Sequence, residues 1–144
     1  MNRKIIARLS AVVLFVLIAV VAYTQNPAAP PDLKINKVKE NLYEIEGDGG
    51  NVAVYVTGNG VILVDDKFER DHDVIMGIVR RLTAQPIKYI LSTHYHADHS
   101  GGNAKMYDSG IEIISTRKSR ENILEKKQSN APPGGRPARI GFTD

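Results

Sequence analysis

Four strand patterns follow one another between residues 33 and 64, and this order constrains the fold more than any other feature of the chain. Residues 33–38 and 42–46 alternate apolar and polar side chains, which is typical of strands with one buried face. Residues 52–57 are rich in β-branched side chains, and residues 61–64 are apolar throughout, which predicts a strand buried on both faces. The turn over 58–60 joins the last two strands, so the domain is expected to open with antiparallel hairpins.

Helix and strand patterns alternate in the second half of the chain. Apolar residues at helical spacing predict a helix that begins near His72, with Asp71 as its cap, and ends before Pro86. A strand over 87–91 follows. The later segments are a short helix over 102–107, a strand over 111–114, a polar surface helix over 118–128 and an aperiodic stretch over 129–144. Hairpins followed by such units predict an α/β (α+β) fold with a mixed sheet and helices packed on it.

The first 24 residues have the composition of an export signal. Basic residues at positions 3, 4 and 8 precede an apolar run over 11–23, and a Pro/Ala-rich linker over 25–33 follows. The run is shorter than the ~18 residues expected of a membrane span, which favours a cleaved signal peptide over an uncleaved N-terminal anchor. Both alternatives predict a periplasmic or secreted domain, attached to the membrane only if the N-terminal segment is retained.

Charge and cysteine content exclude several classes of function. The chain has 19 basic and 16 acidic residues, and three of the basic ones lie in the first eight positions, so the remainder is balanced at 16 against 16. This balance gives no reason to expect a nucleic-acid partner. The absence of cysteine excludes disulfides, a thiolate metal ligand and a cysteine nucleophile within these residues.

The segment 94–99 holds three of the four histidines of the chain and one aspartate. Imidazole and carboxylate groups are ligands of borderline cations such as Zn²⁺. In extended backbone, His94 and His96 lie on the same side and can face one ion. A turn after His96 would bring Asp98 and His99 to a neighbouring position. A solvated loop and a structural metal site without catalysis are the alternatives.

The same cluster directly follows the predicted strand over 87–91. In open α/β sheets, ligands bind at the carboxyl ends of the strands, so this placement favours a binding site. The small residues Ser100, Gly101 and Gly102 after the cluster permit close approach of the backbone. The sequence therefore predicts a metal site at the edge of the sheet.

Residues 93–103 read Thr-His-Tyr-His-Ala-Asp-His-Ser-Gly-Gly-Asn. They resemble the T-H-x-H-x-D-H-x-G-G-N signature of the metallo-β-lactamase-fold hydrolases. Upstream, residues 49–52 and 60–66 resemble the first strands and the acidic motif of this family. The resemblance covers about residues 34 to 127 in order. It implies an αββα sandwich with a one- or two-zinc site at the edge of its sheets, of which residues 34–144 would form the N-terminal half.

The resemblance also implies a role for five residues. His94 and His96 would ligate a first zinc ion, and Asp98 and His99 a second. Asp98 could also act as a catalytic residue that orients the attacking water. Asp65 matches an acidic residue that supports the metal loop without binding the ion, and a solvated strand end is the alternative.

Two other polar residues receive no functional role from the sequence. Asp66 follows Asp65 and is assigned none. His72 lies between Asp71 and Asp73 at the predicted helix start, and we expect it to be a surface residue.

The resemblance lacks the later part of the family pattern. The family uses a third histidine, a further aspartate or cysteine, and a final histidine downstream, whereas no histidine follows His99. We therefore expect a fragment of a longer reading frame. Half of a sandwich would leave the inner face of its sheet exposed.

The expected function is that of an exported zinc-dependent hydrolase. It would direct a metal-activated water at a carbonyl or ester-like bond of a small molecule, with β-lactam, thioester and lactone substrates all open. The alternative is a truncated, non-catalytic metal-binding fragment. A nuclease is less favoured because basic and acidic residues are balanced once the N-terminal basic residues are set aside. An oxygen-reducing di-iron relative is less favoured because such sites typically carry glutamate where this chain has His96.

Overall fold

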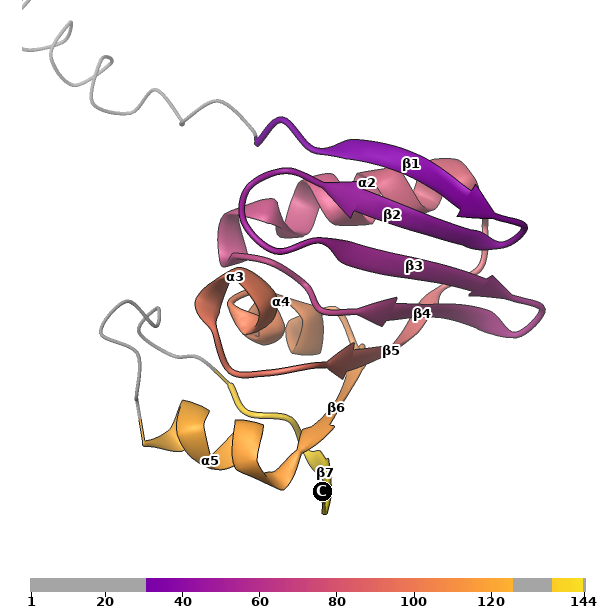
Figure 1. Ribbon diagram of the computed structural model, residues 1–144. Helices are drawn as coiled ribbons and strands as arrows, with labels where there is room; N and C mark the ends of the chain where they lie inside the picture. Colours follow the sequence, from indigo (N-terminus) through magenta and orange to yellow (C-terminus); the bar gives the residue numbers. More distant parts are fainter. Residues whose placement is uncertain (1–30, 126–135, 144) are drawn as a thin grey trace, which may run out of the picture.

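The computed structural model describes residues 31–125 and 136–143 (Figure 1). The predicted signal peptide or anchor over 1–24 and most of the linker over 25–33 lie outside the described residues. None of the helices within the described part of the chain is long and apolar enough to cross a membrane.

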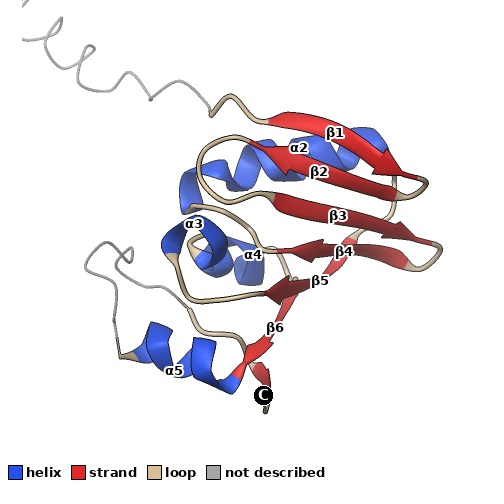
Figure 2. Ribbon diagram, in the orientation of Figure 1, coloured by secondary structure: helices blue, strands red, loops and turns tan. Residues whose placement is uncertain are grey.

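One mixed sheet of seven strands organises the described residues, and its strands are neighbours in sequence order from β1 to β7 (Figure 2). The first four strands pair antiparallel, and β4 to β7 pair in parallel. The mixed sheet predicted from the sequence is therefore confirmed. The strands are β1 Lys34–Lys39, β2 Leu42–Glu46, β3 Val52–Thr57, β4 Gly60–Val64, β5 Ile87–Ser92, β6 Glu112–Thr116 and β7 Ile140–Phe142.

Short helices connect the parallel strands. They are the 3₁₀ turn η1 Glu69–Asp71, α2 His72–Leu82, α3 Ala97–Ser100, α4 Asn103–Asp108 and α5 Arg117–Leu124. The helices predicted near 72–85, 102–107 and 118–128 correspond to α2, α4 and α5. The sequence missed α3 and β7, because elements of three or four residues are too short to show a periodic pattern.

The hydrophobic core lies between one face of the sheet and the helices α2 and α4. Across the sheet, Val54 pairs with Leu63, Leu63 with Ile90, and Ile90 with Ile113, and all four are fully buried. Burial of each such side chain contributes about 1.5–3 kcal/mol. The helices complete this cluster with Ile75, Ile78, Val79, Met106 and Tyr107.

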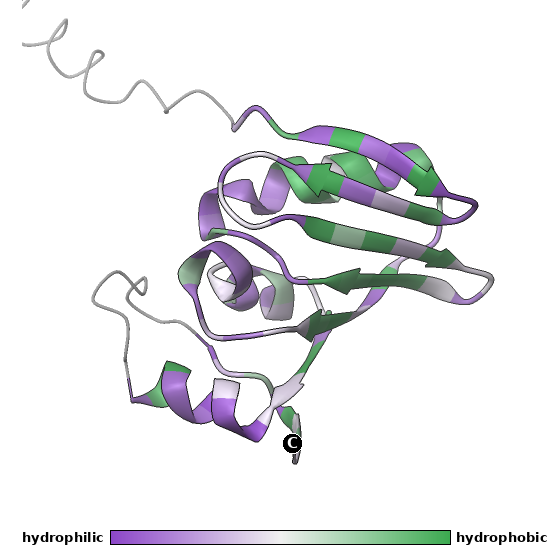
Figure 3. Ribbon diagram, viewed as in Figure 1, coloured by the Kyte–Doolittle hydropathy of each residue, from purple (hydrophilic) through white to green (hydrophobic). Residues whose placement is uncertain are grey.

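The opposite face of the sheet remains half-exposed in the described part of the chain. Tyr55, Ile62 and Tyr89 form one register row across it, and Tyr55 and Tyr89 are 48% and 43% exposed. The prediction that residues 61–64 are buried on both faces is wrong, because Ile62 and Val64 point to this uncovered face and are only partly buried. Figure 3 shows the hydrophobic character of β3 and β4. The expectation of an exposed apolar sheet face therefore matches the structure.

The start of α2 lies at the predicted residue, but its cap differs from the prediction. Asp71 makes no side-chain capping bond, and its Oδ2 instead accepts the Phe68 N–H at 3.1 Å, which closes the preceding turn. His72 is also more enclosed than a surface residue. Its side chain is 12% exposed, and its ring nitrogens lie 2.8 Å from Asp73 Oδ1 and 3.1 Å from Ser109 Oγ.

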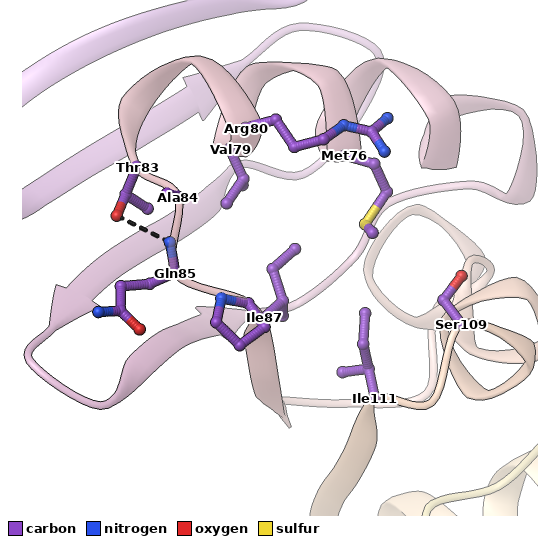
Figure 4. Close-up of a pocket in the computed structure, with 10 residues that line it drawn as sticks. Met76, Val79, Arg80, Thr83, Ala84, Gln85, Ile87, Ser109 and Ile111 are labelled. Atoms are coloured by element: carbon purple, nitrogen blue, oxygen red, sulfur yellow. Dashed lines mark hydrogen bonds between the residues drawn. The ribbon is translucent and has the colours of Figure 1, made fainter.

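A cavity of about 490 Å³ lies between the C-terminal end of α2 and the starts of β5 and β6 (Figure 4). Met76, Val79, Ile87 and Ile111 form its apolar wall. Because Ile87 begins β5 whereas the histidine cluster follows the end of that strand, this cavity lies at the other end of the sheet from the cluster.

Candidate metal centre

The histidine cluster begins just after β5 and turns into α3. His96 is the last residue in extended backbone, with φ −64° and ψ 144°, and α3 starts at the next residue. His94 and His96 therefore precede the turn, and Asp98 and His99 lie within it. The turn predicted after His96 is confirmed.

Two imidazole rings lie against that of His94. Its ring centroid lies 4.7 Å from that of His96 and 4.1 Å from that of His99. Burial, followed by the neighbouring His99 and His96 rings, holds the pKa of His94 below its ordinary value. A neutral imidazole is the form that binds a metal ion, so this packing favours the ligand form of His94.

Asp65 lies at the end of β4 and binds two residues of the histidine loop. Its Oδ1 accepts the Thr93 N–H at 2.7 Å, and its Oδ2 accepts the Thr93 hydroxyl at 2.8 Å. The same Oδ2 lies 2.7 Å from His99 Nδ1. Asp65 is 3% exposed, so it is a buried anchor of the loop rather than a solvated strand end.

These hydrogen bonds place a hydrogen on the Nδ1 atoms of two histidines. The Thr93 hydroxyl has one hydrogen and donates it to Asp65, so it accepts from His94 Nδ1, which lies 2.9 Å away. The Asp65 carboxylate accepts a hydrogen bond from the Nδ1–H of His99 in the same way. The neutral His94 ring therefore keeps an unprotonated Nε2, which is the atom that can bind a metal ion.

The glycine loop between β2 and β3 covers Asp98 and His99. The Gly50 N–H donates to Asp98 Oδ2 at 3.1 Å. A Cβ on Gly50 would lie 2.3 Å from His99 Cε1, and one on Gly49 would lie 2.7 Å from Asp98 Cβ. Only glycine permits this close approach. The sequence showed the glycines but carried no signal for the contact.

The segment 65–68 crosses behind the histidine loop in strained backbone. Asp65 and Lys67 have φ values of 66° and 57°, in the left-handed region that non-glycine residues rarely adopt. The Gly102 N–H donates both to Lys67 O at 3.0 Å and to Asp66 Oδ1 at 3.1 Å. Asp66 is fully buried, and burial raises its pKa well above the ordinary value. This residue, which received no role from the sequence analysis, anchors the turn into α4.

Comparison with known proteins assigns the fold to a family. Residues 45–113 match the family model described as Metallo-beta-lactamase superfamily. These 69 residues, just under half of the chain, carry the pattern of this superfamily. Among curated proteins, the alkyl/aryl-sulfatase BDS1 of Saccharomyces cerevisiae is 24% identical over 118 residues, which cover 72% of this chain and 18% of the yeast protein.

Solved metallo-beta-lactamase structures share the fold. The DIM-1 enzyme superposes with a TM-score of 0.64 at 23% identity, covering 79% of this chain and 52% of that one. The enzyme from Hirschia baltica gives 0.66 at 18% identity, covering 76% and 52%. The mono-zinc form of FIM-1 from Pseudomonas aeruginosa gives 0.67 at 18% identity, covering 81% and 52%. The chain thus spans about half the length of these superfamily members.

The donor set of the cluster suits the metal chemistry of the superfamily. Three imidazoles and one carboxylate are ligand types of zinc, and the bonds from Thr93 and Asp65 orient two of the rings as outer partners of metal ligands do. Among residues 31–125 and 136–143, however, no three such side chains converge on one metal position. His99 Nε2 instead lies 3.5 Å from Asp98 Oδ2.

Proposed function

We propose that this protein is a zinc-dependent hydrolase that acts on a carbonyl or ester-like bond of a small molecule. The observation that carries the proposal is the hydrogen-bond chain from Asp65 through Thr93 to His94, together with the bond from Asp65 to His99. A buried carboxylate that orients two imidazole rings through their Nδ1 atoms, one of them by way of Thr93, is an arrangement that prepares metal ligands.

In this proposal the residues of the cluster divide the work as the family resemblance implies. His94 and His96 would hold one ion, and Asp98 and His99 would hold a second. A bound zinc ion supplies the acidity that makes water a nucleophile near neutral pH, with a pKa of about 7. The Gly50 N–H donates to Oδ2 of Asp98 and so orients this carboxylate, which could also accept a hydrogen bond from the attacking water.

Metal binding without catalysis is the second candidate, and one observation favours it. No three donor side chains in the described part of the chain meet at a single point, whereas a catalytic zinc site usually has three protein ligands. The chain spans about half the length of its structural relatives. The hydrolase activity is therefore proposed for the whole protein and is not a property shown by this chain.

Zinc stoichiometry and turnover measured on the same preparation separate the two candidates. The chain would be stripped with a chelator, reloaded with zinc and assayed with β-lactam, thioester, lactone and aryl sulfate substrates. The last class is included because of the name of the yeast relative. His96→Ala should lose zinc, and His72→Ala is the matched control, since His72 lies outside the cluster. Zinc-dependent turnover supports the hydrolase, and bound zinc without turnover on any class supports the second candidate.

An unchanged zinc content in His96→Ala would contradict both candidates.

The location outside the cytoplasm is a further part of the proposal, and it is supported by the composition of residues 1–24. N-terminal sequencing of the protein recovered from the periplasmic fraction tests it. A start at Met1 would exclude cleavage, and recovery only from the cytoplasm would exclude export.

A further inference from the structure

Lys67 is fully buried beside the candidate metal centre. Its Nζ donates hydrogen bonds to the carbonyl oxygens of Gly47 and Gly50. A buried ammonium group is unfavourable unless it is hydrogen-bonded or paired with opposite charge. Both carbonyls belong to the loop between β2 and β3, so the side chain joins two segments that are about twenty residues apart in the sequence.

The backbone of Lys67 is itself held in an unfavourable conformation. Its φ of 57° is in the left-handed region, where glycine would be free of strain. Its carbonyl oxygen accepts the Gly102 N–H at 3.0 Å, which fixes the peptide against the turn between α3 and α4. The contacts of the Lys67 side chain must therefore offset the free energy that its strained backbone costs.

The loop that Lys67 holds is the one that contacts Asp98 and His99. The Gly50 carbonyl accepts from Lys67, and the Gly50 N–H donates to Asp98 Oδ2. Gly50 thus links Lys67, through its carbonyl group, to Asp98, through its amide group. Any movement of Gly50 away from Lys67 would therefore also change the bond to Asp98.

An ion pair holds the outer side of the same loop. Arg70 Nε and Nη2 lie 2.7 and 2.6 Å from the carboxylate of Asp48, but the Arg70 side chain is 59% exposed. Exposed pairs contribute little to stability. The buried contacts of Lys67 are therefore the stronger constraint on the loop.

We propose that Lys67 is a positioning residue whose ammonium group clamps the loop over 47–50, so that the Gly50 N–H holds Asp98 in its orientation. The clamp is a property of the folded chain, and its consequence for metal binding rests on the proposed function. Sequence reasoning offered no signal for it, because a lysine next to two aspartates has the pattern of a solvated strand end.

Amide hydrogen exchange of the metal-free, full-length chain tests the clamp directly. In Lys67→Met, the amide of Gly50 should exchange about 10–100-fold faster than in the wild type, since hydrogen bonds to a charged group are lost. Core amides in β3 and β5 report on folding in the same sample. Lys67→Gly is the second variant, because glycine accepts the left-handed backbone and relieves its strain. Lys88→Met, at an exposed lysine of β5, is the control and should leave the loop unchanged.

Unchanged exchange of Gly50 in both variants would overturn the proposal. Loss of core protection together with the loop in both would also overturn it, because Lys67 would then hold the fold and not the loop.

A double-mutant cycle tests the consequence for zinc by competition with a chromophoric chelator. Lys67→Met should weaken zinc binding about 10-fold in the wild-type background and have little further effect in Asp98→Asn, because the clamp acts through Asp98. Equal losses in the two backgrounds would contradict an action through Asp98. A wild-type chain that binds no zinc would contradict the proposed function, while the exchange result would still decide whether the clamp exists.

Discussion

Gly102→Ala is a direct test of the packing behind the histidine loop. Gly102 has φ −76° and ψ −13°, which an alanine adopts freely. The cost is therefore steric, because a Cβ would lie 2.8 Å from Asp66 O and 3.0 Å from Asp66 Cγ. Asp66 is fully buried and Lys67 beside it has strained backbone, so neither has room to move. Overpacking of this kind costs about 1–3 kcal/mol.

Urea unfolding provides the measurement. The chain has no tryptophan and six tyrosines, so far-UV circular dichroism or tyrosine fluorescence can follow the transition. With an m value of about 1.5 kcal/mol per M, the Gly102→Ala midpoint should fall by about 0.7–2 M. The same substitution should lengthen the bonds from the Gly102 N–H to Asp66 and Lys67 and so weaken the turn into α4.

Two other glycines separate the steric cost from the backbone cost. A Cβ on Gly58 would meet nothing within 4 Å, and its φ lies outside the left-handed region, so Gly58→Ala should leave the midpoint unchanged or raise it slightly. A Cβ on Gly110 also meets nothing, but its φ is +80°, so Gly110→Ala should cost about 1 kcal/mol from the backbone alone. A midpoint for Gly102→Ala equal to that of Gly58→Ala would refute the reasoning.

Three further substitutions act on charge and on the site. Burial raises the pKa of Asp71 to about 6, so the folded state keeps this proton above the ordinary pKa of 3.8. The stability that this proton contributes is present below about pH 4 and is lost as the pH rises to about 6. The urea midpoint of Asp71→Asn should therefore rise relative to that of the wild type over this interval, and a difference between the two midpoints that does not change with pH would contradict the shift. Asp65→Asn preserves the shape of the side chain but removes the charge that orients His99, so zinc affinity in a chelator competition should fall about 10–100-fold, and an unchanged affinity would exclude this role. Gly50→Ala places a methyl group against the His99 ring. It should therefore weaken zinc binding and lower the urea midpoint by less than Gly102→Ala does, and a midpoint loss as large as that of Gly102→Ala would argue against a local effect.

Most of the sheet was predictable because its strands carry local patterns. Alternation in residues 42–46 and β-branched side chains in 52–57 correspond to the observed β2 and β3 without a shift in bounds. The position of the histidine loop after β5 was also predictable, since it requires only a strand followed by polar residues. β7 escaped prediction because it has three residues and pairs only with the distant β6.

The sequence could not show which sheet face is covered or which segments meet at the site. Residues 61–64 are apolar at every position, yet only Val61 and Leu63 face the helices. The buried Lys67 and Asp66 occupy a polar stretch that has the pattern of exposed loop. Their roles arise from contacts with residues about 17 to 36 positions away, and no local pattern records contacts at such separations.

The geometry of the candidate site follows from the parallel pairing of β4 with β5. In this register Val64 lies opposite Leu91, and the Asp65 N–H donates to the Leu91 carbonyl oxygen at 3.1 Å. Asp65 is thereby placed beside Thr93. A shift of two residues would move its carboxylate by about 6.6 Å and break its bonds to the loop.

A shift of one residue is excluded for a different reason, because it would turn Leu63 out of the core to the exposed face. The burial that stabilises the sheet therefore also sets the position of the carboxylate that holds the histidine loop. Substitutions that loosen the pairing of β4 with β5 should consequently impair metal binding before they unfold the protein, even where they lie far from the histidines.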